Sequence, residues 1–61
     1  MMKFEAGDRV RIATPVRGGA RLLATTGQTG VVERRLNAYA SIVRLDAGDT
    51  VAVRDDEAEH I

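Results

Sequence analysis

The feature that most constrains this chain is a period of two in its apolar residues. In residues 8–13, Val10 and Ile12 alternate with Arg9 and Arg11. Successive side chains of a β-strand point to opposite faces, so the segment predicts a strand that buries its aliphatic residues and exposes its arginines. Three later segments also have strand-forming character, residues 31–35, 40–45 and 50–53. The chain is therefore expected to be all-β.

The chain has 61 residues and no cysteine. A domain of this size buries only about 60% of the surface that its unfolded chain exposes, so its stability must come from one compact core or from self-association. Without cysteine there is no disulfide, thiol nucleophile or cysteine zinc site. No apolar run approaches the roughly 20 residues that span a bilayer, and the first residues lack the apolar stretch of a signal peptide. We expect one cytoplasmic domain, residues 1–61, without membrane contact.

Two hairpin turns are predicted between the later strands. A tight connection through residues 36–39 places Val32 opposite Val43, and residues 46–49 form a second turn with Gly48 at positive φ. The predicted core is Val10, Ile12, Val32, Val43, Leu45, Val51 and Val53. The same register predicts an outer face of Val31, Glu33, Arg35, Ile42 and Arg44, with Glu33 close to Arg44.

The remaining segments carry weaker signals. Residues 15–30 hold the only proline and most of the glycines, which predicts a long loop with at most one helical turn at residues 20–24. Phe4 and Ala6 are spaced to cover one end of the core. The acidic tail, residues 55–61, is expected to begin with a turn and to close the sheet with Ile61. Four or five short strands then require a closed or nearly closed sheet that removes their edges.

Three segments of the chain carry a resemblance to a known family: Phe4–Ile12, Gly27–Val32 and Val43–Asp49. They resemble the small Src-homology-3-like barrels of the KOW type and their bacterial and phage relatives. The resemblance implies a small antiparallel five-stranded barrel with one long loop after the first strand. KOW-type barrels in ribosomal proteins and transcription factors bind RNA, DNA or proteins, and similar barrels serve as small subunits of larger assemblies. This chain departs from the nucleic-acid-binding members in its longer loop, its scarcity of lysine and its lack of a basic excess.

No pattern in the sequence indicates catalysis. A phosphate-binding loop needs a lysine after its glycines, and the only lysine is Lys3. Ser41 and His60 form no implied triad, because no third group is placed to orient the histidine. The acidic tail lacks the spacing of a calcium-binding loop. We expect a protein that is not an enzyme and that uses no cofactor, metal or small-molecule substrate.

The charge is divided along the chain although its sum is zero. Residues 1–35 hold seven basic against three acidic side chains, and residues 36–61 hold two against six. The halves either pair within the fold or leave a basic face for an anionic partner. In the second case nucleic acid would contact phosphate-binding arginines and one stacking aromatic residue: Arg9, Arg11, Arg17, Arg21, Arg34, Arg35 and Tyr39.

Adjacent apolar pairs suggest a different kind of partner. Two neighbouring residues of an extended chain point opposite ways, so one member of each pair is left outside the core. The residues that could form an exposed apolar patch are Leu22, Leu23, Val31 and Ile42. The favoured function is a protein-binding module, either an adaptor or a small subunit of a larger assembly, that binds a protein partner or self-associates. Zero net charge and only two aromatic residues count against the nucleic-acid alternative.

Overall fold

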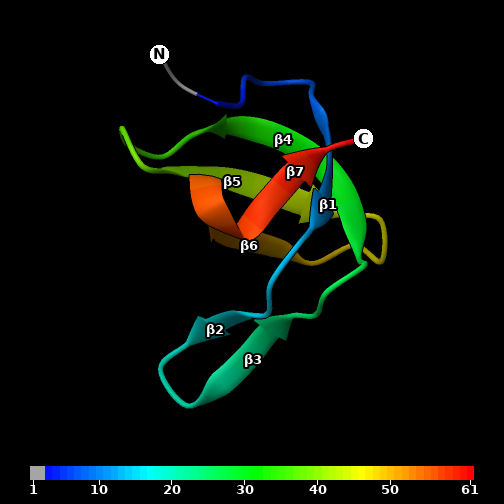
Figure 1. Cartoon of the computed structure of the whole chain (residues 1–61), viewed down its shortest axis with the longest axis vertical. Coiled ribbons are helices and arrows are strands. Elements are labelled where there is room, and N and C mark those ends of the chain that lie inside the picture. The colour runs from blue at the N-terminus through cyan, green and yellow to red at the C-terminus, as the bar shows by residue number, and fades with distance from the viewer. Residues whose placement is uncertain (1–2) are drawn as a thin grey trace.

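The computed structural model describes residues 3–61, which form a five-stranded antiparallel sheet with a two-stranded hairpin projecting from it (Figure 1). The strands of the sheet, in the order in which they pair, are β6 (Thr50–Arg54), β5 (Ala40–Leu45), β4 (Thr29–Arg35), β1 (Arg9–Ile12) and β7 (Ala58–His60). The hairpin consists of β2 (Val16–Gly18) and β3 (Arg21–Ala24), and a short 3-10 turn, η1 (Asp55–Glu57), joins β6 to β7. The expected all-β class is confirmed. The described residues include no helix that is long and apolar enough to cross a membrane.

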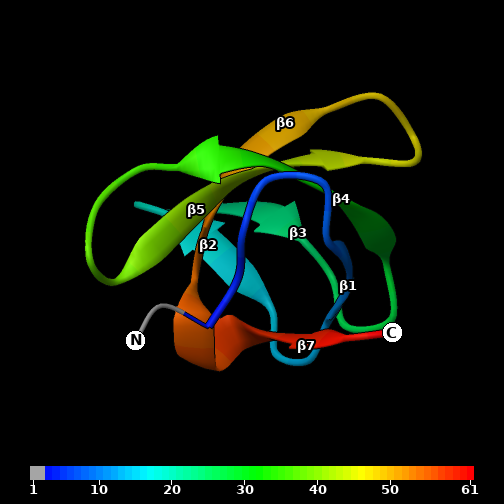
Figure 2. The same cartoon turned by 90° about the horizontal axis from the view of Figure 1, so that it is seen from above.

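The sheet is strongly curved, as the view from above makes clear (Figure 2). Its two edge strands, β6 and β7, are consecutive in the chain and are joined only by η1. A flat sheet of five strands is about 19 Å wide, because neighbouring strands lie about 4.8 Å apart. Three residues of 3-10 helix rise only about 6 Å. The edges must therefore approach one another, although no residue of β6 pairs with β7 within residues 3–61.

The concave face of the sheet holds the core. All seven core residues expected from the alternation are buried. Val32 lies opposite Val43 and Gly48 has a φ of 113°, both as predicted. Phe4 closes one end of the core as expected, but Ala6 is exposed, contrary to the prediction. The core also takes in small residues that alternation did not single out, Val16, Ala24 and Ala58.

A β-bulge in β4 overturns part of the predicted outer face. The register is Val32 opposite Val43 but Arg34 opposite Ile42, so Glu33 is the extra residue. From this point the alternation in β4 is reversed, and Arg35 points inward instead of outward. Its guanidinium binds both carboxylate oxygens of Asp55, at 2.7 and 3.2 Å, and donates to Ser41 Oγ at 2.9 Å. The expected proximity of Glu33 to Arg44 is confirmed at 3.9 Å.

The predicted loop over residues 15–30 is wrong, because its centre is the β2–β3 hairpin. The two-residue turn between Gly18 and Arg21 has positive φ at Gly19 alone, the pattern of a type II′ turn. Val16 and Ala24 pair at the base of the hairpin and are each only 2% exposed. Burial of these two residues explains why a glycine-rich segment is ordered as strands instead of a loop or a helical turn.

The C-terminal segment begins with a turn, as predicted, and then adds a strand to the sheet. β7 pairs with β1, and the Ile61 amide continues this ladder by donating to Arg9 O at 3.2 Å. The Ile61 side chain itself is 60% exposed. The backbone of Ile61, and not its apolar side chain, therefore extends the sheet.

Candidate binding groove

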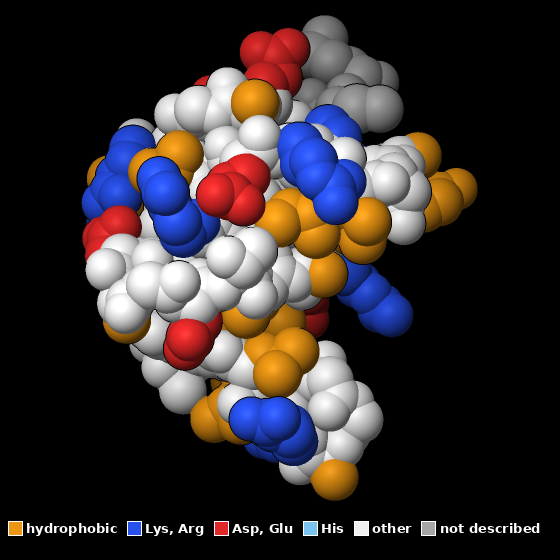
Figure 3. All heavy atoms as spheres, turned by 180° about the vertical axis from the view of Figure 1, so that it is seen from behind, with side chains coloured by type: hydrophobic (Ala, Val, Ile, Leu, Met, Phe, Trp, Pro, Cys, Tyr) orange, Lys and Arg blue, Asp and Glu red, His pale blue; other side chains and the backbone are white. Residues whose placement is uncertain are grey.

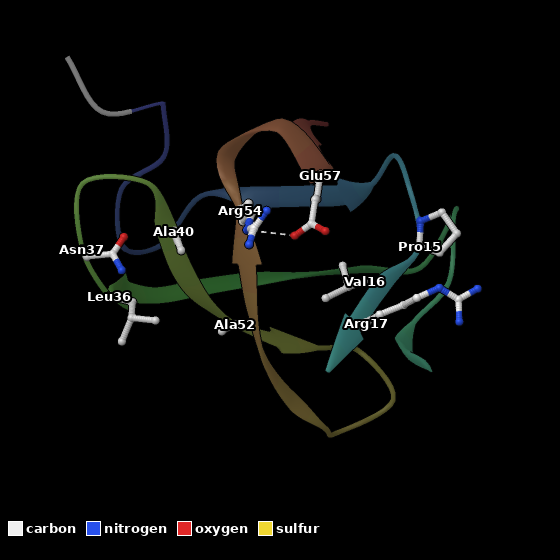
Figure 4. Close-up of a pocket in the computed structure, with 9 residues that line it drawn as sticks. All are labelled: Pro15, Val16, Arg17, Leu36, Asn37, Ala40, Ala52, Arg54 and Glu57. Carbon is white, nitrogen blue, oxygen red and sulfur yellow. Dashed lines mark hydrogen bonds between the residues drawn. The ribbon is translucent and has the colours of Figure 1, made fainter. Parts of the chain in front are cut away.

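The described residues form an open groove with a volume of about 480 Å³. Its floor is formed by Ala40 and Ala52, which lie on the outer faces of β5 and β6. Figure 4 shows the two walls: β2 and the residue before it lie on one side, and the β4–β5 connection lies on the other. The lining residues are Pro15, Val16, Arg17, Leu36, Asn37, Ala40, Ala52, Arg54 and Glu57.

Short connections hold the two walls and the η1 end of the groove in place. The amides of Ala13 and Thr14 donate to Glu57 O at 2.8 and 3.3 Å, which ties η1 to the start of β2. The ion pair of Arg35 with Asp55 holds η1 to β4, and Arg35 also donates to Asn37 O at 3.0 Å. One partly buried arginine, Arg35, thereby positions both η1 and the β4–β5 connection. The arrangement favours a preformed groove.

The lining of the groove carries two guanidinium groups and one carboxylate. Arg17 and Arg54 have no carboxylate oxygen within 4.0 Å among residues 3–61. Glu57 Oε1 accepts a hydrogen bond from the Arg54 amide at 2.9 Å, so this carboxylate is held against the backbone (Figure 4). The lining therefore has an excess of positive charge, and its two arginines are available to an anionic group.

The apolar residues expected to form one patch lie in two places. Val31 and Ile42 are half-buried on the outer face of β4 and β5. Leu22 is 48% exposed on β3, whereas Leu23 is the bulged residue of the hairpin and packs against the core. The two leucines line a smaller hollow of about 240 Å³ beside the start of β6. None of these four residues lines the groove described above.

The arginines proposed for nucleic-acid contact fall into two groups. Arg9 binds Asp46 at 2.8 Å, Arg11 lies 3.5 Å from Glu59, and Arg35 is bound to Asp55. The halves of the chain with opposite charge thus pair in part within the fold. Within residues 3–61, no carboxylate lies within 4.0 Å of the other three, Arg17, Arg21 and Arg34. Tyr39 is 77% exposed in the β4–β5 connection.

The Arg9–Asp46 ion pair lies on the surface of the molecule. Hydrogen bonds from Arg9 and from the Thr29 hydroxyl lower the pKa of Asp46 from 3.8 to about 2. The same carboxylate raises the pKa of Arg9. This pair joins β1 to the β5–β6 turn on the outside of the sheet. It leaves Arg9 with its charge already partnered.

The serine and histidine that were weighed as a catalytic pair have separate surroundings. Ser41 is buried at 1% exposure, and its hydroxyl accepts a hydrogen bond from Arg35. His60 Nε2 lies 3.2 Å from Asp8 Oδ2, and its ring meets Phe4 edge-on with 4.7 Å between the centroids. The hydrogen bond from the Glu5 amide is the main cause of a lowered pKa of Asp8, and the hydrogen bond with His60 lowers this pKa further. Residues 3–61 contain no group of three or more His, Asp or Glu side chains arranged to hold a metal ion.

Several groove residues were not identified from the sequence. Ala40, Ala52 and Arg54 belong to two strands whose pairing sets them side by side, and Leu36 and Asn37 come from a turn. The outward positions of residues 50–54 follow from the alternation, but their relation to β2 depends on the hairpin. Figure 3, the view from behind, shows apolar side chains between blue basic side chains above the projecting hairpin.

No protein-family model, curated protein or solved structure matches this chain.

Proposed function

We propose that the chain is a non-enzymatic binding module, a protein–protein adaptor or a small subunit of a larger assembly, and that it binds its partner in the groove over β6. The carrying observation is the groove itself: about 480 Å³, with alanines on its floor and Leu36, Arg17 and Arg54 on its sides. Protein interfaces combine apolar contact with arginine-rich margins in this way. Short turns and the partly buried Arg35–Asp55 ion pair hold the groove in shape, which reduces the ordering cost of binding.

We also propose a more specific fold than the all-β class, a small Src-homology-3-like barrel of the KOW type. It is supported by the meander of β4, β5 and β6, by β1 lying between β4 and β7, and by the three-residue connection between the two sheet edges. The projecting hairpin takes the place of the long loop after the first strand. In this assignment the groove lies between that hairpin and the next connection.

A protein partner is favoured over nucleic acid by the state of the arginines. Arg9, Arg11 and Arg35 already bind carboxylates of the chain. Contact with phosphates would have to displace them or use the remaining arginines alone. Nucleic-acid affinity depends on the number of phosphates neutralised, and three to four dispersed arginines give only weak, salt-sensitive binding.

The test is a selection of random peptides displayed on phage against the purified protein, followed by affinity measurements on two variants. Ala52→Arg fills the groove floor, and Leu22→Arg adds the same charge on the hairpin outside the groove. We expect selected peptides to lose about tenfold or more in affinity for Ala52→Arg, and to keep their affinity for Leu22→Arg within about threefold.

Two results would contradict the proposal. In the first, the selected peptides bind Ala52→Arg as well as they bind the parent protein. In the second, no peptide is enriched, and a generic oligonucleotide binds more tightly than about micromolar at physiological salt, beyond ordinary non-specific binding. Circular dichroism of both variants shows whether each one keeps the β fold.

A further inference from the structure

We infer that the groove takes an extended acidic segment of a partner protein, which adds to the open edge of β6 as a further strand. The inference rests on the protein-binding function proposed above and names the chemistry of the partner. Three features of the groove carry it: the open backbone edge of β6, the absence of aromatic side chains from the lining, and the two arginines without carboxylate partners.

The first feature is the edge of β6, which pairs with β5 on one side only within residues 3–61. The ladder with β5 is bracketed by the bond from Leu45 N to Asp49 O and by that from Asp55 N to Tyr39 O. Backbone groups of alternate residues point the same way, so Val51 and Val53 also face β5. The N–H and C=O of Ala52 then face the open edge.

Arg54, two residues after Ala52 in β6, supports the outward direction of the Ala52 backbone groups. Arg54 has the same parity as Ala52, and its amide donates to the Glu57 carboxylate instead of to β5. Ala52 also lines the groove, with Val16 and Arg17 on the facing wall (Figure 4). Natural edge strands are commonly protected by lysine, proline or a bulge. β6 contains no lysine or proline, and its pairing with β5 has no register shift.

The second feature distinguishes strand addition from recognition of a polyproline helix. Grooves that bind proline-rich segments are lined by aromatic side chains. The residues that line this groove include no aromatic residue. Strand addition needs no aromatic lining, because main-chain hydrogen bonds supply the affinity.

The third feature sets the charge of the partner. Arg17 and Arg54 lie on different elements around the same groove and have no carboxylate within 4.0 Å among residues 3–61. Guanidinium groups bind carboxylates through two parallel hydrogen bonds, which adds geometric selectivity. The one lining carboxylate, Glu57, already accepts the Arg54 amide. A strand with acidic side chains on one face therefore complements the groove better than a neutral or basic strand.

The experiment uses fluorescein-labelled seven-residue peptides and fluorescence anisotropy on the intact chain. One peptide alternates valine with glutamate and another alternates valine with lysine. Two further versions of the glutamate peptide are N-methylated at alternate residues, each of them on a different backbone edge. We expect the glutamate peptide to bind at least about tenfold more tightly than the lysine peptide. One N-methylated version should lose about tenfold or more, and the other should stay within about threefold of the parent peptide.

Matched charge reversals test the arginines. The double variant Arg17→Glu, Arg54→Glu should reverse the preference between the glutamate and lysine peptides. The control Arg21→Glu, Arg34→Glu makes the same charge change at two arginines outside the groove lining and should preserve the preference. If the groove variant does not fold, the pair of N-methylated peptides still tests strand addition on the parent protein.

The outcomes separate this inference from the proposed function. If both N-methylated peptides bind equally well, the groove binds peptides but not by strand addition, and the inference is wrong. The inference is also wrong if the lysine peptide binds best and Ala52→Arg abolishes its binding. If no peptide binding responds to Ala52→Arg, the proposed function is wrong as well. If sedimentation shows a dimer that Ala52→Arg dissociates, and no peptide binds, the occupant is a second copy of the chain and the inference is overturned.

Discussion

The five-stranded sheet and the β2–β3 hairpin are joined to the same core by very different amounts of structure. In the sheet, β1, β4 and β5 each pair with a strand on both sides. The hairpin pairs only with itself and is anchored by Val16, Ala24 and the partly buried Leu23. A region with few buried contacts opens at lower free energy than the core strands. The sheet therefore provides the floor of the groove, and we expect the hairpin wall to open at lower free energy than this floor.

The largest expected effect comes from the core under the sheet. Val43 lies in the middle strand of the β4–β5–β6 meander and is 1% exposed. We expect Val43→Ala to lower the free energy of unfolding by about 2–3 kcal/mol, because it removes buried methyl groups and leaves a cavity. Leu22→Ala on the exposed side of the hairpin should cost less than about 0.5 kcal/mol. Urea denaturation measures both, and equal shifts of the midpoint would refute the contrast.

The next effect concerns the ion pair that the bulge turns inward. The side chains of Arg35 and Asp55 are only 15% and 26% exposed, whereas those of Arg11 and Glu59 are 46% and 54% exposed. We expect Arg35→Met to cost about 2 kcal/mol, because it leaves Asp55 and the Ser41 hydroxyl without their donor. Arg11→Met should cost no more than about 0.5 kcal/mol. A similar loss of stability in the two variants would mean that the inward ion pair contributes no more than a surface pair.

Substitution of two glycines with positive φ, one in each region, compares the stability of the hairpin with that of the sheet. Gly19 forms the hairpin turn with a φ of 62°, and Gly7 precedes β1 with a φ of 94°. Alanine at either position costs about 1 kcal/mol of backbone strain. We expect Gly19→Ala to accelerate amide exchange only within β2 and β3. The Gly7 amide donates to Val32 O at 2.7 Å, so the backbone at Gly7 is tied to β4 of the sheet. Backbone strain in Gly7→Ala should therefore lower the global stability. Faster exchange throughout the sheet in Gly19→Ala would show that the hairpin is not a separate unit.

The smallest effect is a change in stability at acidic pH. The pKa of Asp46 is lowered from 3.8 to about 2 in the folded chain. Because the folded carboxyl holds its proton less tightly than the unfolded one, its contribution to stability is present above about pH 4 and is lost as the pH falls through about 2. We expect Asp46→Asn to flatten this part of the dependence of stability on pH. Parallel curves for the parent and the variant between pH 4 and pH 2 would contradict the assignment.

The sequence predicted four of the five strands of the sheet, β1, β4, β5 and β6, because each of these carries a local signal, whereas β7 lies in the acidic tail and carries none. Alternation of Val10 and Ile12, and of Val51 and Val53, identifies both the strands and their buried face. The Gly48 turn is likewise a local signal. The bulge at Glu33 has no such signal, because nothing in a Val-Glu-Arg-Arg run marks which residue is unpaired. The inward position of Arg35 depended on that one residue and was therefore missed.

The hairpin and the groove were harder to predict for different physical reasons. Gly18-Gly19 between Val16 and Leu22 is a recognisable hairpin turn, but the density of glycine in the segment favoured a loop. The groove has no local signal, since β2, the β4–β5 connection, β5, β6 and η1 all contribute to it. Its lining depends on long-range pairing and on where the hairpin lies. Alternation indicates that Ala52 faces outward, but not what it faces.

Amide chemical-shift mapping tests most directly whether the groove over β6 is the binding face. The isotopically labelled protein is titrated with a selected peptide. We predict that the largest shifts fall on Ala52 and Arg54 of β6 and on Val16 and Arg17 of β2, which line the groove. Shifts in the amides around Val31 and at the tip of the hairpin should be small. Largest shifts at Arg21, Arg34 and Tyr39, with Ala52 unmoved, would contradict it.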